Sequence, residues 1–540
     1  MSEVVDAVVV GAGPNGLVAA NALADAGWDV LVLEAQDTPG GAVRTAETTR
    51  PHFRTDLFSA FYPFAAASPV LRDLGLDAYG LRWVHAPDVL AHTLDDGRTA
   101  VLHRRPEDTA AGLDRAHPGD GAAWLRMVDA WTAVRDPLLD ALFRPFPPVR
   151  PAVRLLRRLG AAGTLDLARL ALLPVRRLAD EEFGGEGPAL LLTGNAMHAD
   201  VPPDAAGSGL YGWLLTMLGQ DVGFPVPAGG AGGLAGALVG RLVAAGGAVR
   251  TRAAVEQVLV RHGRAVGVRT HDGRVVLARR AVLADVSAPG LYEDLVGTEH
   301  LPPALRRALR RFQWDHPTVK VDWALAGPVP WRGDGARGAG TVHLGVDRDG
   351  FVAASAALST GRQPERPFVV LGQMSTADPS RSPAGTESAW AYTHLPHRPA
   401  GAGRWTDGAG RWTDGEARAA ADRLQAAVER AAPGFSDLVL ARQVQGPADL
   451  HGADANLFHG AIGGGTSAPH QQLVLRPTPG LGRAETPVER LYLASASAHP
   501  GGGVHGACGW NAALAALRDA GPTGPLRRRL LRTAWSRLLS

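Results

Sequence analysis

The sequence predicts an α/β protein built around a Rossmann-like nucleotide-binding domain. Two observations lead to this prediction. A strand, a glycine-rich turn and a helix follow one another in the first 26 residues, and the same succession returns near residues 491–517. Such a unit is typical of a parallel sheet whose glycine turn faces a nucleotide.

The first motif has the spacing of a dinucleotide site. Residues 6–10 predict a buried strand, residues 14–26 a helix, and residues 28–33 a second strand that ends at an acid. Of the three glycines, one makes the tight turn, one admits a pyrophosphate, and one lets the helix pack closely; the acid can accept both ribose hydroxyls. The candidate binding residues are Gly11, Gly13, Pro14, Asn15, Gly16, Glu34 and Ala35.

Composition limits the class of protein. The chain has 540 residues, 46% of them hydrophobic, which is enough for about three average domains with cores. A net charge of +2 gives no overall case for nucleic acid, and the lone Cys508 excludes an internal disulfide or a cysteine metal cluster, so we expect no metal. No apolar run reaches membrane-spanning length and no signal peptide is evident, which predicts a cytoplasmic protein.

A second glycine pair follows the first motif. Gly40 and Gly41 lie in a turn of small residues, and Arg44 comes three residues later. Together with the first motif, this turn resembles the paired-glycine signature of the flavoprotein superfamily that includes amine oxidases and phytoene desaturases. The resemblance implies FAD as cofactor, with both turns lining it and Ser59 near the flavin. The alternative for Arg44 is an ordinary loop cation.

The middle of the chain resembles the same proteins. A helix is predicted over residues 234–245, followed by strands over 248–250, 255–260, 265–270, 275–278 and 281–285. In phytoene-desaturase-like proteins such a helix and small sheet return the chain to the FAD domain, and Val255 would contact the adenine side through its backbone. The resemblance therefore implies a discontinuous FAD-binding domain with an inserted substrate domain of mixed sheet and helices.

The C-terminal motif closely resembles the second FAD motif of that group. A strand over residues 491–494 leads to a turn that contains Gly502, Gly503 and Val504, and a helix is predicted to run to about residue 517. Free N–H groups at a helix start can face the flavin, and the helix dipole favours negative charge there. Ser495 departs from the usual glycine. His499 precedes the turn and is a candidate contact to substrate or flavin, with a purely structural role as the alternative.

Lys320 is the only lysine among 55 basic residues. It lies in residues 318–325, whose alternation places Lys320, Asp322 and Ala324 on one face of a strand. A compact ammonium differs from a guanidinium in shape and ease of deprotonation. The segment looks like the strand of flavin amine oxidases that presents a lysine, through water, to the flavin, so Lys320 is the leading catalytic candidate.

Three other segments have distinctive composition. Residues 149–177 and 525–540 are rich in arginine and leucine, and each is either a helix on an anionic membrane surface or a helix docked on the protein. The seven residues GAGRWTD occur twice in succession over 401–414, which predicts a duplicated surface loop that ends in a capping box of Thr413 and Glu416.

We expect residues 1–68, 222–295 and 445–520 to form the FAD-binding domain, 69–221 and 296–444 the substrate domain, and 521–540 a basic tail. The expected function is oxidation, or flavin-assisted isomerisation, of a C–C bond in a small apolar isoprenoid or polyene-like substrate, with oxygen or a quinone as electron acceptor. The alternatives are an amine oxidase, a non-enzymatic prenyl-binding escort protein and, less compatible with two separated nucleotide motifs, a nicotinamide-dependent dehydrogenase. Oligomeric state is left open.

Overall fold

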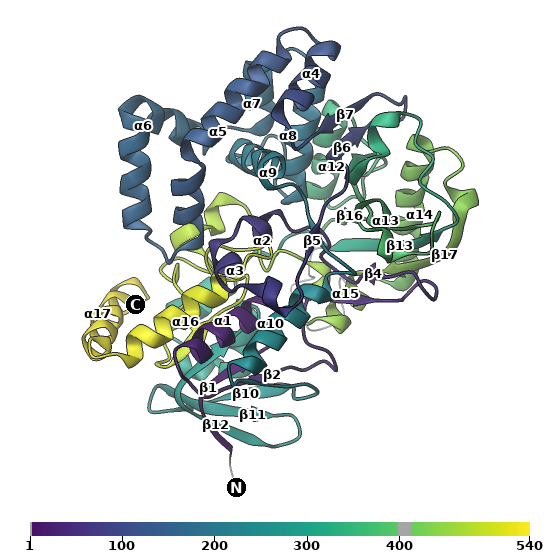
Figure 1. Cartoon of the computed structure of the whole chain (residues 1–540). Coiled ribbons are helices and arrows are strands. Elements are labelled where there is room, and N and C mark those ends of the chain that lie inside the picture. The colour runs from purple at the N-terminus through teal and green to yellow at the C-terminus, as the bar shows by residue number, and fades with distance from the viewer. Residues whose placement is uncertain (1–2, 398–411, 540) are drawn as a thin grey trace.

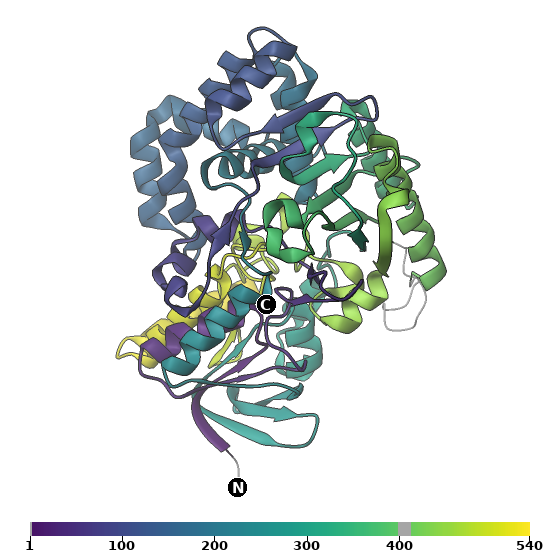
Figure 2. The same ribbon diagram turned by 45° about the vertical axis from the view of Figure 1, so that its right-hand side comes forward.

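The computed structural model describes residues 3–397 and 412–539, and its body consists of a nucleotide sheet and a substrate sheet (Figure 1). Both views place the nucleotide sheet and its helices in the lower half of the molecule, with the substrate sheet above it (Figure 2). The fold class predicted from the sequence is confirmed: an α/β protein with a discontinuous nucleotide-binding domain and an inserted domain of mixed sheet and helices.

The nucleotide sheet combines strands from three separate parts of the chain. β1 pairs in parallel with β2 and β12, β2 with β9, and β12 with β18, whereas β10, β11 and β12 pair antiparallel. The strand order is β10 (Val255–Arg261), β11 (Arg264–Thr270), β12 (Val275–Ala284), β1 (Glu3–Val10), β2 (Val30–Leu33) and β9 (Ala248–Arg250), with β18 (Leu491–Leu493) beside β12.

The sequence predicted two strands where β12 is one. Arg279 and Arg280 interrupt the apolar pattern, which caused the error. Both side chains turn outward and approach the Asp6 carboxylate at 3.4 Å, so the strand continues through them. β12 can therefore pair with β11 in its first half and with β1 along most of its length.

Three helices pack together against the nucleotide sheet: α1 (Pro14–Asp25), α10 (Gly232–Ala244) and α16 (Ala507–Ala520). Gly509 of α16 lies so close to α1 that an added Cβ would stand 1.8 Å from the Asn15 carbonyl oxygen. A glycine is needed at this crossing because any side chain would separate the helices. The contact brings the first and last sequence motifs side by side.

The substrate sheet is buried on both faces. α14 (Asp414–Ala431) covers one face, and α8 (Glu186–His198) and α9 (Ser208–Val222) contact β6 and β7 of the sheet. The predicted capping box of Thr413 and Glu416 starts α14. The strand order is β17 (Val439–Gln445), β13 (Thr318–Leu325), β16 (Glu387–His394), β15 (Val369–Gln373), β14 (Ala339–Leu344), β6 (Asp88–Thr93) and β7 (Thr99–Leu102).

The basic segment of residues 149–177 is not one continuous helix. Gly160 has φ 65° and interrupts α6 (Val149–Leu170), and a turn separates α6 from α7 (Val175–Glu182). The C-terminal tail forms α17 (Gly524–Leu538), which docks through Trp535 on the nucleotide-domain core. Among the described helices, none has the length and apolar composition needed to cross a bilayer.

Two-residue strands, short helices and the longer helices α4, α5 and α12 are the other elements that the structure describes. The first GAGRWTD copy and the start of the second lie outside the described residues. The remaining helices and strands are β3 (Thr45–Ala46), β4 (Thr55–Asp56), α2 (Pro63–Ala67), α3 (Pro69–Asp73), β5 (Trp83–Val84), α4 (Pro106–Ala116), α5 (Asp120–Phe143), β8 (Val226–Pro227), α11 (Pro303–Leu309), α12 (Arg348–Ser359), α13 (Met374–Ala377) and α15 (Pro447–Ala453).

Candidate active site

The first glycine turn is held tightly against the end of β2. Gly11 has φ 92°, and a Cβ on Gly16 would lie 2.2 Å from the Gly11 carbonyl oxygen. Glu34 accepts the Ala12 N–H through Oε2 at 2.7 Å and the Gln36 N–H through Oε1 at 2.9 Å. Each carboxylate oxygen keeps a second lone pair for a ribose hydroxyl.

The second glycine turn packs on the first. The Gly40 N–H donates to the Ala12 carbonyl at 2.8 Å, and a Cβ on Gly41 would lie 3.0 Å from the Gly13 Cα. Arg44 donates to the carbonyls of Gly41 and Ala453, both at 2.8 Å, and so joins the second turn to the segment before Asp454. The two turns therefore form one cradle that excludes side chains.

Ser59 and Val255 lie at the edges of this cradle. Ser59 donates its hydroxyl proton to the Ala42 carbonyl at 2.7 Å, next to the second glycine turn. Val255 begins β10, two residues after Ala253, whose N–H donates to the Glu34 carbonyl at 2.8 Å. Both residues are thus placed beside the predicted nucleotide site by backbone contacts.

Two buried carboxyl groups that the sequence analysis did not single out border the cradle. Asp285 follows β12 and accepts the Gly16 N–H at 2.8 Å. Burial, with Asp454 and Glu34 nearby, raises the pKa of Asp285 to about 7. Burial also raises the pKa of Asp454 to about 6, although Arg44 opposes this shift. The position of Asp285 at the end of a predicted buried strand was the available signal.

The C-terminal turn is organised by a buried arginine. Arg476 donates to the Ala496 carbonyl at 2.7 Å and to the carbonyls of Gly463 and Thr466 at 3.1 and 3.0 Å. The backbone of Gly502 and Gly503 remains exposed beside this arrangement. α16 begins at Ala507, so Val504 belongs to the turn and the helix starts slightly later than the motif suggested.

Lys320 has a charged partner on its own strand. Its ammonium group forms a buried ion pair with Asp322, two residues along β13. Burial raises the pKa of Asp322, and the Lys320 charge counteracts this shift. A second fully buried ion pair, between Asp56 and Arg381, lies close enough for the Asp56 charge to act on Asp322.

The strand pairings place Lys320 in a row across the inner face of the substrate sheet. The row runs from Lys320 to Tyr392 of β16, Val370 of β15, His343 of β14 and His92 of β6. Directly paired residues project to the same side of a sheet. Lys320 therefore shares this face with an aromatic ring and two buried imidazoles.

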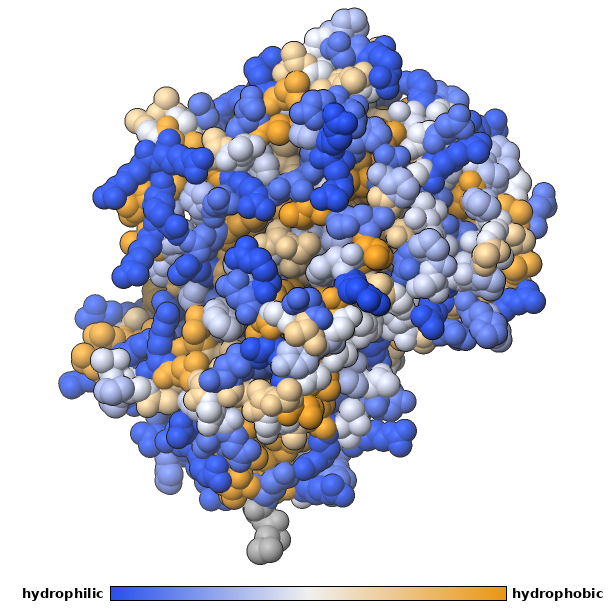
Figure 3. All heavy atoms as spheres, in the orientation of Figure 1, coloured by the Kyte–Doolittle hydropathy of each residue, from blue (hydrophilic) through white to orange (hydrophobic). Residues whose placement is uncertain are grey.

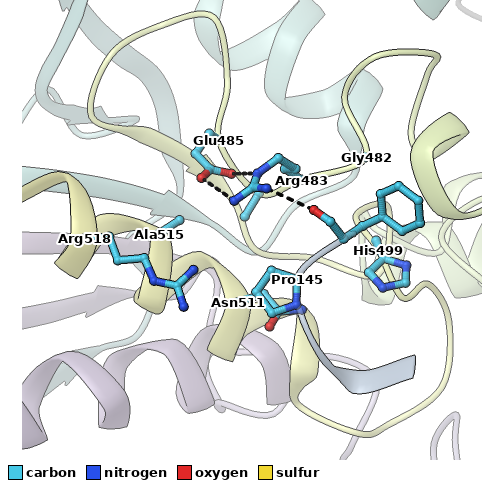
Figure 4. A pocket seen from close by; sticks show the side chains of 10 residues that line it. Pro145, Gly482, Arg483, Glu485, His499, Asn511, Ala515 and Arg518 are labelled. Atoms are coloured by element: carbon cyan, nitrogen blue, oxygen red, sulfur yellow. Dashed lines mark hydrogen bonds and ion pairs between the residues drawn. The ribbon is translucent and has the colours of Figure 1, made fainter. Parts of the chain in front are cut away.

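The His499 side chain contacts the segment that follows helix α5. Its Nε2 bonds to the Arg144 carbonyl at 3.1 Å, and its ring meets Phe146 edge-on. Burial lowers the pKa of His499 to about 4. Figure 4 shows its ring in a small pocket with Pro145, Asn511 and Arg483. These contacts favour the structural role over the catalytic one.

The fold and the two facing motifs define a dinucleotide-binding protein, and comparison with known proteins identifies its family as one of oxidoreductases. The family model of the flavin containing amine oxidoreductases matches residues 15–387. This chain belongs to that family, and its cofactor is FAD.

Relatives and solved structures extend over nearly the whole chain. Mouse pyridine nucleotide-disulfide oxidoreductase domain-containing protein 2 is 30% identical over 95% of this chain and 93% of its own. The lycopene-forming phytoene desaturase of Pseudescherichia vulneris is 24% identical over 94% and 98%. An oxidoreductase structure from Methanosarcina mazei shares the fold, with a TM-score of 0.60 and 15% identity over 95% of this chain and 99% of that one.

The cradle suits FAD. Where the glycine turns meet, added Cβ atoms on Gly13 and Gly41 would lie 2.6 Å from Asp285 Oδ2 and 3.0 Å from the Gly13 Cα, so only bare backbone fits. Glu34 would hold the adenosine ribose, the two glycine turns and Arg44 the pyrophosphate, and the Gly502–Val504 turn the flavin end.

Proposed function

We propose that the protein oxidises or isomerises a C–C bond in an apolar isoprenoid or polyene-like molecule, with FAD as its redox cofactor. One observation carries the proposal: the end-to-end match to a phytoene desaturase, which covers 98% of that relative. A match of this extent includes the substrate domain as well as the nucleotide motifs. Oxygen or a quinone would accept the electrons afterwards.

The inner side of the substrate sheet favours an apolar guest. Trp390 and Tyr392 stack with ring centroids 6.0 Å apart, and Phe61 contacts Trp390 at 6.1 Å. Met374 and Val370 belong to the same buried cluster. Burial of such surface contributes roughly 25 cal/mol per Å², so an extended hydrocarbon gains binding energy along its length.

The protein's own residues would bind and orient this molecule and exclude water from it. FAD, when bound, supplies the hydride-accepting chemistry. Lys320, held by Asp322 on the inner face, would position a water molecule near the reacting atoms. Exclusion of water from the site would strengthen each of these polar contacts.

Amine oxidation is the principal rival. A cationic amine would need a carboxylate or an aromatic cage, but Asp322 and Asp56 are each neutralised by a buried basic partner. Trp390 and Tyr392 lie nearly parallel to each other, 13° apart, in the same buried apolar cluster. The described inner face therefore supports a neutral substrate better than a cation.

Anaerobic reduction of the flavin separates these functions. The protein is mixed without oxygen with phytoene in detergent micelles, or with benzylamine, and the visible flavin absorption is followed. We expect phytoene to bleach the flavin and benzylamine to leave it oxidised. The opposite pattern would establish an amine oxidase, and a colourless protein that takes up no FAD would point to a prenyl-binding escort.

A further inference from the structure

Asp200 and His316 form a carboxylate–imidazole pair outside the residues considered so far. The Asp200 carboxylate accepts from His316 Nδ1 at 2.9 Å and from the His316 backbone N–H at 2.9 Å. Two bonds to one residue fix both the backbone and the ring orientation. With Nδ1 bonded to the carboxylate, the Nε2 atom carries the free lone pair of the neutral ring.

The backbone at Asp200 caps the end of α8. Asp200 has φ 58°, and its N–H donates to the Met197 carbonyl at 3.0 Å while the Val201 N–H donates to the Ala196 carbonyl at 3.1 Å. This left-handed helix C-cap fixes the position of the carboxylate. His316 lies two residues before β13, the strand that carries Lys320. The cap therefore holds the Asp200 carboxylate in place to orient the His316 ring.

The pair lies next to the C-terminal flavin turn. Asp315, adjacent to His316, accepts the N–H groups of Ile462 at 2.6 Å and Gly463 at 2.7 Å. The Gly463 carbonyl is so close to Gly502 that an added Cβ there would be 2.8 Å away. Only this short loop therefore separates His316 from the turn that faces the flavin.

His316 differs from the other histidines of the inner face in its access. Its side chain is 18% exposed, whereas His92 and His343 are fully buried and His394 is 5% exposed. The titratable groups around it are Asp200 after α8, Asp315 on its own loop, His394 on β16, and His397, whose ring centroid is 4.8 Å away. Burial lowers the pKa of His316, but the Asp200 carboxylate outweighs this effect and raises it.

We propose that His316, oriented by Asp200, is the base that takes the proton released from carbon during the oxidation. The inference rests on the proposed function. When a C–C bond becomes C=C, one C–H bond gives up its electron pair and hydrogen as hydride to the oxidised flavin. The adjacent C–H bond gives its proton to His316 Nε2, and its electrons form the new π bond. Asp200 stabilises the resulting imidazolium, which later releases the proton to water.

The first experiment measures anaerobic flavin reduction by phytoene as a function of pH. The wild-type rate should rise with pH and level off above the pKa of His316, because only the neutral ring accepts a proton. His316→Gln should slow the reduction by about a hundredfold or more and abolish the inflection. Asp200→Asn should slow it and move the inflection to lower pH, since the carboxylate no longer favours the charged ring.

Controls separate the chemistry from folding. The control variant is His271→Gln, in an exposed turn of the nucleotide sheet, and it should keep the wild-type rate. FAD content and thermal stability are measured for each variant, which identifies a folding defect. A folded, FAD-loaded His316→Gln variant with wild-type rate and pH profile would overturn the assignment while leaving the proposed function intact.

A second experiment needs no substrate. Diethyl pyrocarbonate acylates accessible neutral imidazoles, and peptide mass spectrometry locates the label. His316 should react more readily as pH rises, and Asp200→Asn should shift this dependence to lower pH. If phytoene fails to reduce the wild type but His316 reacts in this way, the proposed substrate is wrong, whereas His316 remains an accessible ring whose basicity Asp200 raises. If His271 is labelled and His316 is not, the assignment of His316 as the base is wrong.

Discussion

The single lysine of the chain is explained by its buried partner. Lys320 and Asp322 are 4% and 1% exposed, so neither charge can be left alone in the core. Lys320→Met should lower the free energy of unfolding by about 3–5 kcal/mol, because it leaves Asp322 without a partner. Chemical denaturation measures this loss.

A double variant separates this stability effect from catalysis. The double variant Lys320→Met with Asp322→Asn removes both charges. It should therefore recover much of the stability that the Lys320→Met variant loses. If Lys320 positions a water molecule near the flavin, the double variant should still reduce its flavin slowly. Recovery of both stability and rate would show that the lysine serves only the ion pair.

Asp285 should make cofactor binding sensitive to pH. Its pKa is raised to about 7 against an ordinary value of 3.8, so the folded protein favours the neutral acid. This stabilisation is complete below about pH 4 and is lost as pH rises to about 7. A pyrophosphate beside Asp285, Asp454 and Glu34 adds further negative charge. FAD affinity of the apoprotein should therefore fall as pH rises through 7.

Fluorescence titration of apoprotein with FAD measures this dependence. Asp285→Asn keeps an oxygen for the Gly16 N–H but cannot ionise, so its affinity should vary less with pH. Asp272→Asn, on an exposed turn, is the matched control. An unchanged pH dependence in Asp285→Asn would assign the effect to another group, with Asp454 the next to replace.

Site residues could be predicted from the sequence where a local pattern reflects a conformation that the backbone must adopt. The glycines and Glu34 follow from strand, turn and helix spacing. Asp200 and His316 were not predictable, because they are far apart in sequence and only the fold pairs them. The role of Arg476 was equally inaccessible, since it binds backbone carbonyls of two separate segments, residues 463–466 and Ala496.

At the scale of elements, the α1–α16 crossing joins the two ends of the chain. Gly509→Ala should destabilise the protein and lower its FAD content, because the new methyl group would meet the Asn15 carbonyl. Gly236→Ala in α10 is the control, since an added Cβ there meets nothing within 4 Å. It should stabilise its helix by up to about 1 kcal/mol. Equal stability and equal FAD content in the two variants would contradict the role of the α1–α16 crossing.

Elements were predicted correctly where their pattern was uniform. The strand over residues 318–325 and the capped helix α14 appear as expected. Charge and glycine caused the errors: two arginines concealed the continuity of β12, and Gly160 divides a segment that composition suggested was continuous. The contacts of Arg279 and Arg280 with Asp6 keep β12 continuous, and the backbone torsion of Gly160 interrupts α6.

At the scale of the whole molecule, the two basic helices α6 and α17 lie on the same side in Figure 1. Figure 3 shows hydrophobic side chains among hydrophilic ones along this side. Leu165 is 71% exposed, and Leu526 and Leu530 are each 64% exposed. We propose that this side rests on an anionic membrane, where leucines insert and arginines meet headgroups.

Vesicle co-sedimentation tests this proposal without removing Trp535 from the core. The wild type should sediment with phosphatidylglycerol vesicles and less with phosphatidylcholine. Leu526→Gln with Leu530→Gln should weaken the binding, and Leu440→Gln, on β17, should not. Equal binding by all three proteins would exclude the membrane role of α17.

The central claim is that both ends of the chain build one FAD site. The most direct measurement is the visible spectrum of the purified protein together with its extracted cofactor. We expect one FAD per chain, and its loss when either Gly13 or Gly502 is replaced by valine in a protein that still folds. A folded wild-type protein that binds no FAD, or binds it equally well in both variants, would contradict the account.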